Sequence, residues 1–356
     1  MNDTERRITE LDGIRGLAAL GVVVYHYHRH LEGAPLDALL FPVYRGGLLF
    51  VDLFFVLSGF ILAQVYAHEA RYPTLRGAVV SRIARLYPLH LLTLFAVAVL
   101  QKAHVALIDH GFVYVYNDWW HLSLNVFMLN ESGLQRGFSF NGPSWSISTE
   151  FIVNVLFLAV ALRNPKRALW LGVALAAAMI ALDAAVHWTE PPRWLEPFSR
   201  LFRCFLGFGV GLVLRTVHDR AKPVRAPQWT IEAGFVAAIA AMLYFMSRPE
   251  RPAAFYALAL VVFPALVLLS LRSVYAAAVL RTRPIVHLGE ISFSVYLLHF
   301  PLELATKDLI ALTGVRPQFD SPMALAVMMT ACIAISHVTW KYFEMPARKR
   351  VKRALS

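Results

Sequence analysis

Ten apolar segments of about 20 residues each run through the chain, and they constrain its fold more than any other feature. A helix of that length spans the hydrocarbon core of a bilayer. Only 16% of the 356 residues are charged, against about 25% in a soluble domain. The sequence therefore predicts an all-α polytopic membrane protein with about ten transmembrane helices. The predicted spans are residues 11–30, 47–66, 86–106, 145–162, 169–187, 198–216, 229–247, 253–271, 287–305 and 321–340.

The positions of Lys and Arg predict how these spans are oriented. If the N-terminus is inside, the inner segments hold 22 of the 34 basic residues. Such an excess in short loops is typical of the cytoplasmic side, so we expect both termini to be cytoplasmic. The stretch MNDTERRITELDGIRG has acidic residues and no small-residue cleavage site, so we expect no removable signal peptide. The inner segments counted are 1–10, 67–85, 163–168, 215–228, 272–286 and 341–356.

Composition argues against several other classes of protein. The net charge of +11 is carried largely by short loops, so we expect a lipid bilayer, and no nucleic acid, beside these basic residues. Cys204 and Cys332 lie in apolar segments, and their spacing predicts neither a disulfide framework nor a metal site. No soluble domain, low-complexity tract or internal repeat is evident. We interpret residues 1–356 as a single integral-membrane unit.

Arg15 and His26 are polar residues within the first predicted span. Eleven residues at about 100° each end within about 20° of the starting face, so both side chains share one face, about 16 Å apart. A cation and an imidazole are costly inside a bilayer unless they face the bundle interior or a watery cavity. The pair therefore indicates an enzyme or a transporter.

Two carboxylates enter predicted spans. Asp52 begins the second span at a depth similar to that of His26, so it could orient the imidazole or reach the outer interface instead. Glu150 enters the fourth span. It is a candidate catalytic residue, and the structural alternative is an ion pair with Arg200 or Arg203.

Arg82 and Arg85 are spaced i, i+3 at the inner entrance of the third predicted span. Two guanidiniums on one helix face can bind phosphate oxygens bidentately. Spacing alone, however, favours the ordinary excess of positive charge in an inner loop.

Further candidates lie near the outer ends of the spans. Trp145 suits an interface anchor, and with Ser146 it is a candidate for binding an acceptor substrate. His299 lies at a depth similar to that of His26 and is equally compatible with a site or with packing. Five other histidines are interpreted as interface or core residues: His28, His30, His121, His187 and His337.

Six segments in order, from residue 11 to residue 348, together resemble the acyltransferase-3 family of integral membrane acyltransferases. They are LDGIRGLAALGVVVYH, VDLFFVLSGFIL, RIARLYP, PSWSISTEF, GEISFSVYLLH and YFEMPAR. The resemblance is to the O-acetyltransferase type without a fused SGNH hydrolase-like domain. It covers nearly the whole chain.

The resemblance implies about ten transmembrane helices and transfer of an acyl group, usually acetyl, to a hydroxyl. The acceptor would be a carbohydrate, such as a cell-envelope or exported glycan, and the location the bacterial inner (cytoplasmic) membrane. It marks Arg15 and His26 as the core of the catalytic machinery, and Arg82 and Arg85 as a donor site. Whether a separate extracytoplasmic partner protein completes the transfer stays open.

These expectations combine into one hypothesis. Cytoplasmic acyl-CoA, with acetyl-CoA as the expected co-substrate, would be held by Arg82 and Arg85, with Arg15 further along its path. Its pantetheine arm would present the thioester near His26, which would act as general base or, less favourably, as nucleophile. Asp52 or Glu150 would orient the imidazole, and no metal is expected because a thioester is already activated.

A rival reading is a proton-coupled transporter or flippase of a glycan or small molecule. Buried Arg, His, Asp and Glu also build proton relays and substrate pathways. The absence of repeated halves and of paired broken helices from the sequence pattern argues against it.

Overall fold

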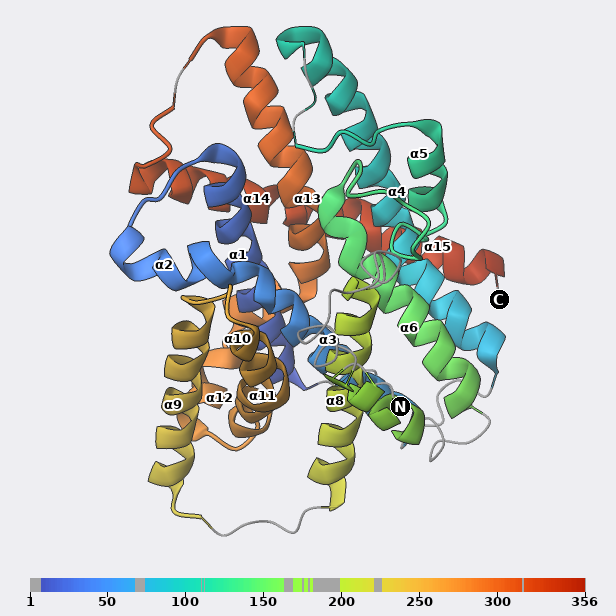
Figure 1. Ribbon diagram of the computed structural model, residues 1–356, viewed down its shortest axis with the longest axis vertical. Coiled ribbons are helices and arrows are strands. Elements are labelled where there is room, and N and C mark those ends of the chain that lie inside the picture. The colour runs from blue at the N-terminus through green and yellow to red at the C-terminus, as the bar shows by residue number, and fades with distance from the viewer. Residues whose placement is uncertain are drawn as a thin grey trace.

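The computed structural model describes residues 8–67, 74–109, 111, 113–162, 169–174, 176–178, 180–181, 199–220, 226–315 and 317–355. Regular structure in these ranges is helical throughout, and the helices form one bundle (Figure 1). The α-helices are α1 (Thr9–Leu31), α2 (Asp37–Gly46), α3 (Phe50–Ala67), α4 (Leu75–Ile108), α5 (Trp119–Val126), α6 (Trp145–Ala161), α8 (Ser199–Arg220), α9 (Gln228–Met246), α10 (Pro252–Ala257), α11 (Phe263–Ser270), α12 (Val274–Leu280), α13 (Arg283–Thr313), α14 (Pro322–Thr339) and α15 (Met345–Leu355). Short 3-10 turns cover Gly47–Leu49 and Gly142–Ser144, and π turns cover Leu258–Val262 and Trp340–Glu344.

Eight helical stretches in the described part are long and apolar enough to cross a membrane, which confirms the prediction of an all-α polytopic membrane protein. Two of the ten predicted spans are not among them. Residues 11–30 lie within α1. The first turn of this helix carries Glu10 and Asp12, and its last turn carries His28, Arg29 and His30. Of residues 169–187, the structure describes 169–174, 176–178 and 180–181, and the rest of this predicted span lies outside the described residues. The eight stretches are Asp37–Val65, Leu75–Ile108, Gly142–Ala161, Ser199–Arg220, Gln228–Met246, Pro252–Ser270, Arg283–Thr313 and Pro322–Leu355.

Helices α1 and α13 pack against each other over most of their length. A methyl group at Gly16 would lie 2.6 Å from the backbone nitrogen of Gly289, and one at Gly289 would collide with the carbonyl of Asp12. Glycine therefore allows the two backbones to touch, as small residues do between membrane helices. Both helices run in the same direction, because Arg15 meets Ser292 early in each helix and His26 meets His299 further along.

A second close pair is formed by α3 and α8. A methyl group at Gly59 would collide with the carbonyl of Phe208, and one at Gly211 with the carbonyl of Val56. The sequence feature Ser58-Gly59 thus marks a close helix contact, as the small-residue rule indicates. Because α3 is central, 67% of the most apolar window of its stretch is buried.

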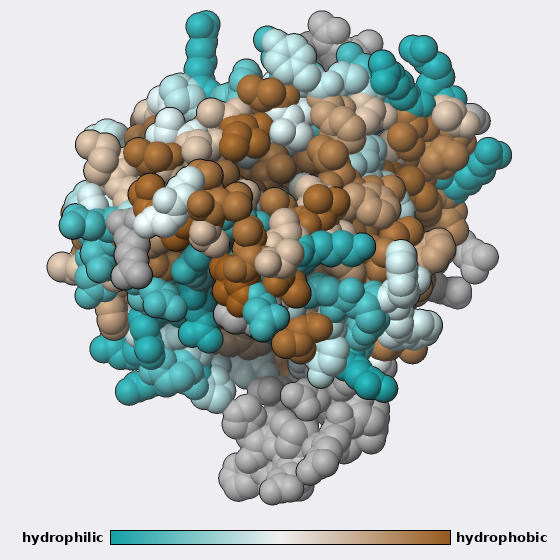
Figure 2. All heavy atoms as spheres, turned by 90° about the horizontal axis from the view of Figure 1, so that it is seen from above, coloured by the Kyte–Doolittle hydropathy of each residue, from teal (hydrophilic) through white to brown (hydrophobic). Residues whose placement is uncertain are grey.

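Helices α4, α9 and α14 lie at the periphery and present apolar side chains outward. Only 6% of the apolar window of α9 is buried. Figure 2 shows hydrophobic residues covering a broad band across the visible surface, with many hydrophilic ones below this band and at the upper rim. Exposed apolar side chains suit contact with lipid tails. They include Phe95 and Val99 on α4, Val236 on α9, and Val327 and Val338 on α14.

The connection between α4 and α6 covers one side of α13. It contains the short helix α5, whose Trp119 and Trp120 are exposed. Asn141 donates from Nδ2 to the carbonyl of Leu297 over 3.0 Å, and the ring of Tyr114 stacks on Phe300 at 5.4 Å. This connection thereby packs against the part of α13 that carries His299.

Candidate active site

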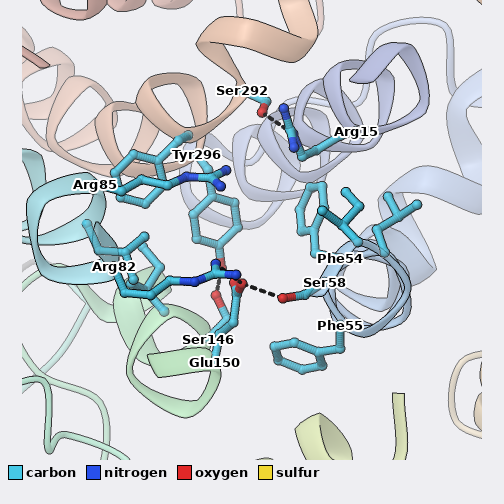
Figure 3. A pocket seen from close by; sticks show the side chains of 15 residues that line it. Arg15, Phe54, Phe55, Ser58, Arg82, Arg85, Ser146, Glu150, Ser292 and Tyr296 are labelled. Atoms are coloured by element: carbon cyan, nitrogen blue, oxygen red, sulfur yellow. Dashed lines mark hydrogen bonds and ion pairs between the residues drawn. The ribbon is translucent and has the colours of Figure 1, made fainter. Parts of the chain in front are cut away.

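A cavity lies between α1, α3, α4, α6 and α13, with the starts of the two close-packed helices along one wall (Figure 3). Its empty volume is about 800 Å³, a figure that includes open solvent at its mouth. The polar residues that line it are Arg15, Ser58, Arg82, Arg85, Ser146, Glu150, Ser292 and Tyr296. Five of the nine predicted site residues therefore share one cavity.

Arg15 is held in a fixed orientation at this cavity. Its Nε donates to Ser292 Oγ over 3.1 Å, and its Nη2 donates to the carbonyl of Gly289 over 3.0 Å. Nη2 also lies 2.7 Å from Asp12 Oδ1, one turn earlier on α1. A guanidinium that is held by three groups loses little freedom when it binds a ligand.

Arg82 and Arg85 extend from α4 into the cavity (Figure 3). Arg82 lies 4.0 Å from Glu150, whose Oε1 also accepts a hydrogen bond of 2.7 Å from Ser58. Arg85 forms no hydrogen bond or ion pair with the described residues. Three guanidiniums and one carboxylate thus face this space, and such a surplus of positive charge is suited to binding phosphate groups.

Tyr296 and Ser146 lie side by side in the lining of the cavity. The Tyr296 hydroxyl is 2.8 Å from Ser146 Oγ and donates to the carbonyl of Pro143 over 2.8 Å. The ring of Tyr296 lies 5.8 Å from the ring of His299, one turn further along α13. Tyr296 therefore lines the cavity and also contacts a second polar region.

That second region is a cluster of three histidines and a carboxylate, which we call the histidine cluster: His26, His30, His299 and Glu303. The ring of His26 lies 5.2 Å from that of His30 and 4.7 Å from that of His299. His30 Nδ1 is 2.6 Å from Glu303 Oε2. All four side chains are buried or nearly so. Burying polar groups costs free energy, and within a membrane protein such groups usually pair with one another or serve a function.

The hydrogen bond of His26 determines which ring nitrogen can accept a proton. Its Nδ1 lies 3.0 Å from the carbonyl of Val22, which can only accept. Nδ1 must then carry the proton in the neutral ring, which leaves the lone pair on Nε2. The arrangement assigns Nε2 of His26 as the basic atom.

Asp52 was one of two carboxylates considered as a partner of His26, and the contacts of its side chain are with an arginine. Asp52 instead accepts two hydrogen bonds from Arg203 on α8, of 3.2 Å from Nε and 2.6 Å from Nη2. The two helices α3 and α8 pack so closely that the guanidinium of Arg203 reaches the carboxylate of Asp52 directly. Arg203 also lies over the ring of Trp145, 5.7 Å from its centroid.

Glu150 and Trp145 also differ from what the sequence suggested. The alternative pairing of Glu150 with Arg200 or Arg203 is not formed, because these arginines bind Glu131 and Asp52. Glu150 points into the arginine-lined cavity instead. Trp145 is buried and packs edge-on against Phe55 at 6.1 Å, so it is a core residue at this position and not an interface anchor.

Sequence reasoning missed two members of the histidine cluster. His30 was interpreted as an interface or core residue, and Glu303 was not singled out. The signal was present as two i, i+4 pairs, His26 with His30 and His299 with Glu303, which place two polar side chains on one face of each helix. The sequence does not indicate that these two helix faces lie opposite each other in the fold.

A further buried carboxylate lies in the connection before α6. Glu131 accepts hydrogen bonds of 3.2 Å from Arg200 and of 2.9 Å from Gln135. Burial raises the pKa of Glu131 to about 7, although Arg200 opposes this shift. The described residues contain no group of three or more His, Cys, Asp or Glu side chains that could hold a metal ion.

Comparison with known proteins identifies the family. The family model described as an acyltransferase domain, of the acyltransferase-3 type, matches residues 8–341. The chain belongs to this acyltransferase family. The resemblance drawn from the six segments is therefore confirmed, and so is the prediction of an O-acyltransferase at the level of the family.

Three relatives illustrate the range of the acyltransferase family. The chain is 23% identical to the peptidoglycan O-acetyltransferase OatA of Listeria monocytogenes, over 97% of this chain and 56% of OatA. It is 29% identical to the acyltransferase MdmB of Streptomyces mycarofaciens, over 83% of this chain and 78% of MdmB. It is 20% identical to the putative O-acetyltransferase SACOL0978 of Staphylococcus aureus, over 99% of this chain and 59% of the relative. The chain thus spans little more than half the length of two of these relatives. No solved structure matches it.

Proposed function

We propose that this acyltransferase moves an acyl group, acetyl in the first instance, from cytoplasmic acyl-CoA to a hydroxyl of a carbohydrate acceptor. The observation that carries the proposal is the parallel pair α1 and α13, which joins an arginine-lined cavity to the histidine cluster. Two relatives are named as O-acetyltransferases, one of them for peptidoglycan, which supports a cell-envelope or exported glycan as the acceptor.

The donor would bind with its nucleotide in the arginine-lined cavity. Coenzyme A carries several phosphates, and Arg15, Arg82 and Arg85 can each offer a planar fork to phosphate oxygens. Glu150 limits the freedom of Arg82 while leaving Arg85 available. The pantetheine arm would then extend along α1 for the distance of about 16 Å that separates Arg15 from His26 by helix rise.

Acyl transfer would occur at the histidine cluster, with His26 as general base. Nε2 of His26 takes the proton of the acceptor hydroxyl while the oxygen attacks the thioester carbonyl carbon. The carbon–sulfur bond breaks, and the departing thiolate of coenzyme A takes up the proton from His26. General-base assistance is worth about 10²–10⁴-fold, and alignment of the two reactants contributes more.

Other predicted residues would support these two steps. His299 lies against His26 and lines the route of the acceptor, while Ser146 and Tyr296 form the wall that the thioester must pass. Trp145 supports Arg203, which holds Asp52, so these three act on the position of α3 against α8.

The proposal places the chain in the bacterial inner membrane, where it works as a single unit. With both termini in the cytoplasm, the arginine-lined cavity lies toward the cytoplasmic end of α1 and the histidine cluster toward the opposite side. This order matches the location of acyl-CoA on one side and of envelope glycans on the other.

The proposal is tested with purified protein in lipid nanodiscs. Radiolabelled acetyl-CoA and a panel of glycan fragments are added, and labelled glycan and free coenzyme A are measured. Equal amounts of both products are expected. Proton-coupled uptake of a glycan into liposomes, without any acylated product, would instead identify a transporter.

A further inference from the structure

Glu303 is the buried carboxylate of the histidine cluster. It has no exposed surface, and Oε2 lies 2.6 Å from His30 Nδ1. Its other oxygen, Oε1, has no hydrogen-bond partner, and neither ring nitrogen of His299 forms a hydrogen bond of normal geometry. Buried polar atoms are almost always satisfied, so these three atoms keep hydrogen-bonding capacity that the described residues do not use.

The orientation of His30 is fixed from two sides. Glu303 holds Nδ1, and the ring packs edge-on against Phe300 at 5.5 Å. Phe300 in turn stacks on Tyr114 from the long connection. A histidine held by a carboxylate in this way resembles the base-and-orienter part of known acyl-transfer sites.

His26 needs a nearby negative charge if it is to act as a base. Taking a proton converts the ring to a cation inside a region of low dielectric constant, where an uncompensated charge is very costly. Neither of the carboxylates first considered supplies it, because Asp52 binds Arg203 and Glu150 faces Ser58 and Arg82. The ring of His30, which carries the contact to Glu303, lies 5.2 Å from that of His26.

We propose that Glu303, acting through His30, is the carboxylate that stabilises His26 in its protonated form during acyl transfer. The inference rests on the proposed function. The proton moves from the acceptor hydroxyl to Nε2 of His26 and then to the thiolate of coenzyme A. Glu303 keeps its bond to His30 throughout, so it is a positioning residue, and no proton or acyl group is left on it.

The chain contains a matched control for this pair. His104 on α4 and Asp308 on α13 form a second buried histidine–carboxylate pair, with Nδ1 and Oδ1 2.5 Å apart. Asp308 is five residues beyond Glu303 on the same helix, and the described contacts do not connect it to His26. If buried pairs had only a structural role, removing the carboxylate charge of either pair would change activity to the same extent.

The test compares Glu303→Gln with Asp308→Asn in purified protein, using acetyl-CoA and the acceptor fragment that the wild type labels. Glu303→Gln keeps the shape and removes the charge. We expect kcat to fall about 100-fold, in line with the loss of most general-base assistance, with the KM for acetyl-CoA and the melting temperature unchanged. Asp308→Asn should keep kcat within about 2-fold of the wild type.

Two further variants keep the inference open to refutation. His30→Gln should reproduce the loss of kcat, and Glu303→Asp should recover part of it even if Glu303→Gln folds poorly. The inference is overturned if Glu303→Gln retains kcat within about 3-fold, or if Asp308→Asn loses as much. If the wild type itself transferred no acyl group, the proposed function would be overturned as well. Failure of the proposed function is therefore distinguishable from failure of the inference about Glu303 alone.

Discussion

The ring of Tyr296 lies 5.8 Å from the ring of His299 on the same helix, so one side chain lines the arginine-lined cavity and also contacts the histidine cluster. Its hydroxyl is tied to Pro143 and Ser146, which fixes the start of α6 against α13. In the proposed function, a donor with its nucleotide among the arginines would bring its thioester past this residue. The proposed function then predicts that the binding of the donor and the transfer of its acyl group can be disturbed separately.

His26→Ala should abolish acyl transfer while leaving coenzyme A binding within about 2-fold of the wild type. The reason is that His26 does not line the cavity, whereas its Nε2 is the basic atom of the cluster. Transfer is measured with radiolabelled acetyl-CoA and binding by calorimetry. His28→Ala is the control, because the His28 ring faces Gly33 and Tyr44. Wild-type transfer rates in His26→Ala would refute the assignment.

Arg85→Ala should weaken coenzyme A binding about 10- to 100-fold, since a hydrogen bond to a charged group contributes about 1.5–3 kcal/mol. Arg82→Ala should have a smaller or equal effect because Arg82 already lies near Glu150. Arg76→Ala on the same helix is the control, as Arg76 lies outside the cavity and donates to the carbonyl of Leu355. Unchanged affinity in the double variant Arg82→Ala/Arg85→Ala would remove the donor site from this cavity.

Asp52→Ala should destabilise the folded protein more than it affects the chemistry of the remaining folded fraction. Removing one partner of a buried ion pair costs about 3–5 kcal/mol, because Arg203 is left uncompensated. Thermal unfolding in detergent measures the first effect, and kcat per folded molecule the second. The double variant Asp52→Ala/Arg203→Ala should recover part of the lost stability. A large loss of kcat without a lower melting temperature would return Asp52 to the catalytic centre.

Stability should fall as the pH rises from about 4.5 to about 7, through the contribution of Glu131. Its pKa in the folded protein is about 7, above the ordinary 4.5, so the folded state holds a proton that the unfolded chain releases. The stabilisation by that proton is complete at low pH and lost as the pH rises through the folded value. Melting temperatures of the wild type and Glu131→Gln are compared between pH 4.5 and 8. If both proteins showed the same pH dependence, Glu131 would not be its source.

Much of the fold could be predicted because a bilayer demands long apolar helices. The predicted spans 86–106 and 287–305 lie within α4 and α13, and the i, i+3 spacing of Arg82 and Arg85 indicated two cations on one face. The 100° rule likewise placed Arg15 and His26 on a shared face of α1, and both meet α13. These are properties of single helices, and a sequence determines them locally.

The pairing of side chains across helices could not be predicted in the same way. Asp52 and Arg203 are 151 positions apart, and their contact depends on the glycines that bring α3 and α8 together. His30 and Glu303 are 273 positions apart. A carboxylate in a span needs a partner, but which partner it finds is decided by helix packing.

The contact between Gly16 and Gly289 has a consequence for the choice of donor. Neither position has room for a methyl group, so α1 and α13 cannot slide past or rotate against each other without a collision of their backbones. Arg15 and His26 share α1, and their positions relative to Ser292 and His299 on α13 are then fixed as well. Such an enzyme would distinguish donors by the reach of the arm that carries the thioester, before the identity of the acyl group itself could matter.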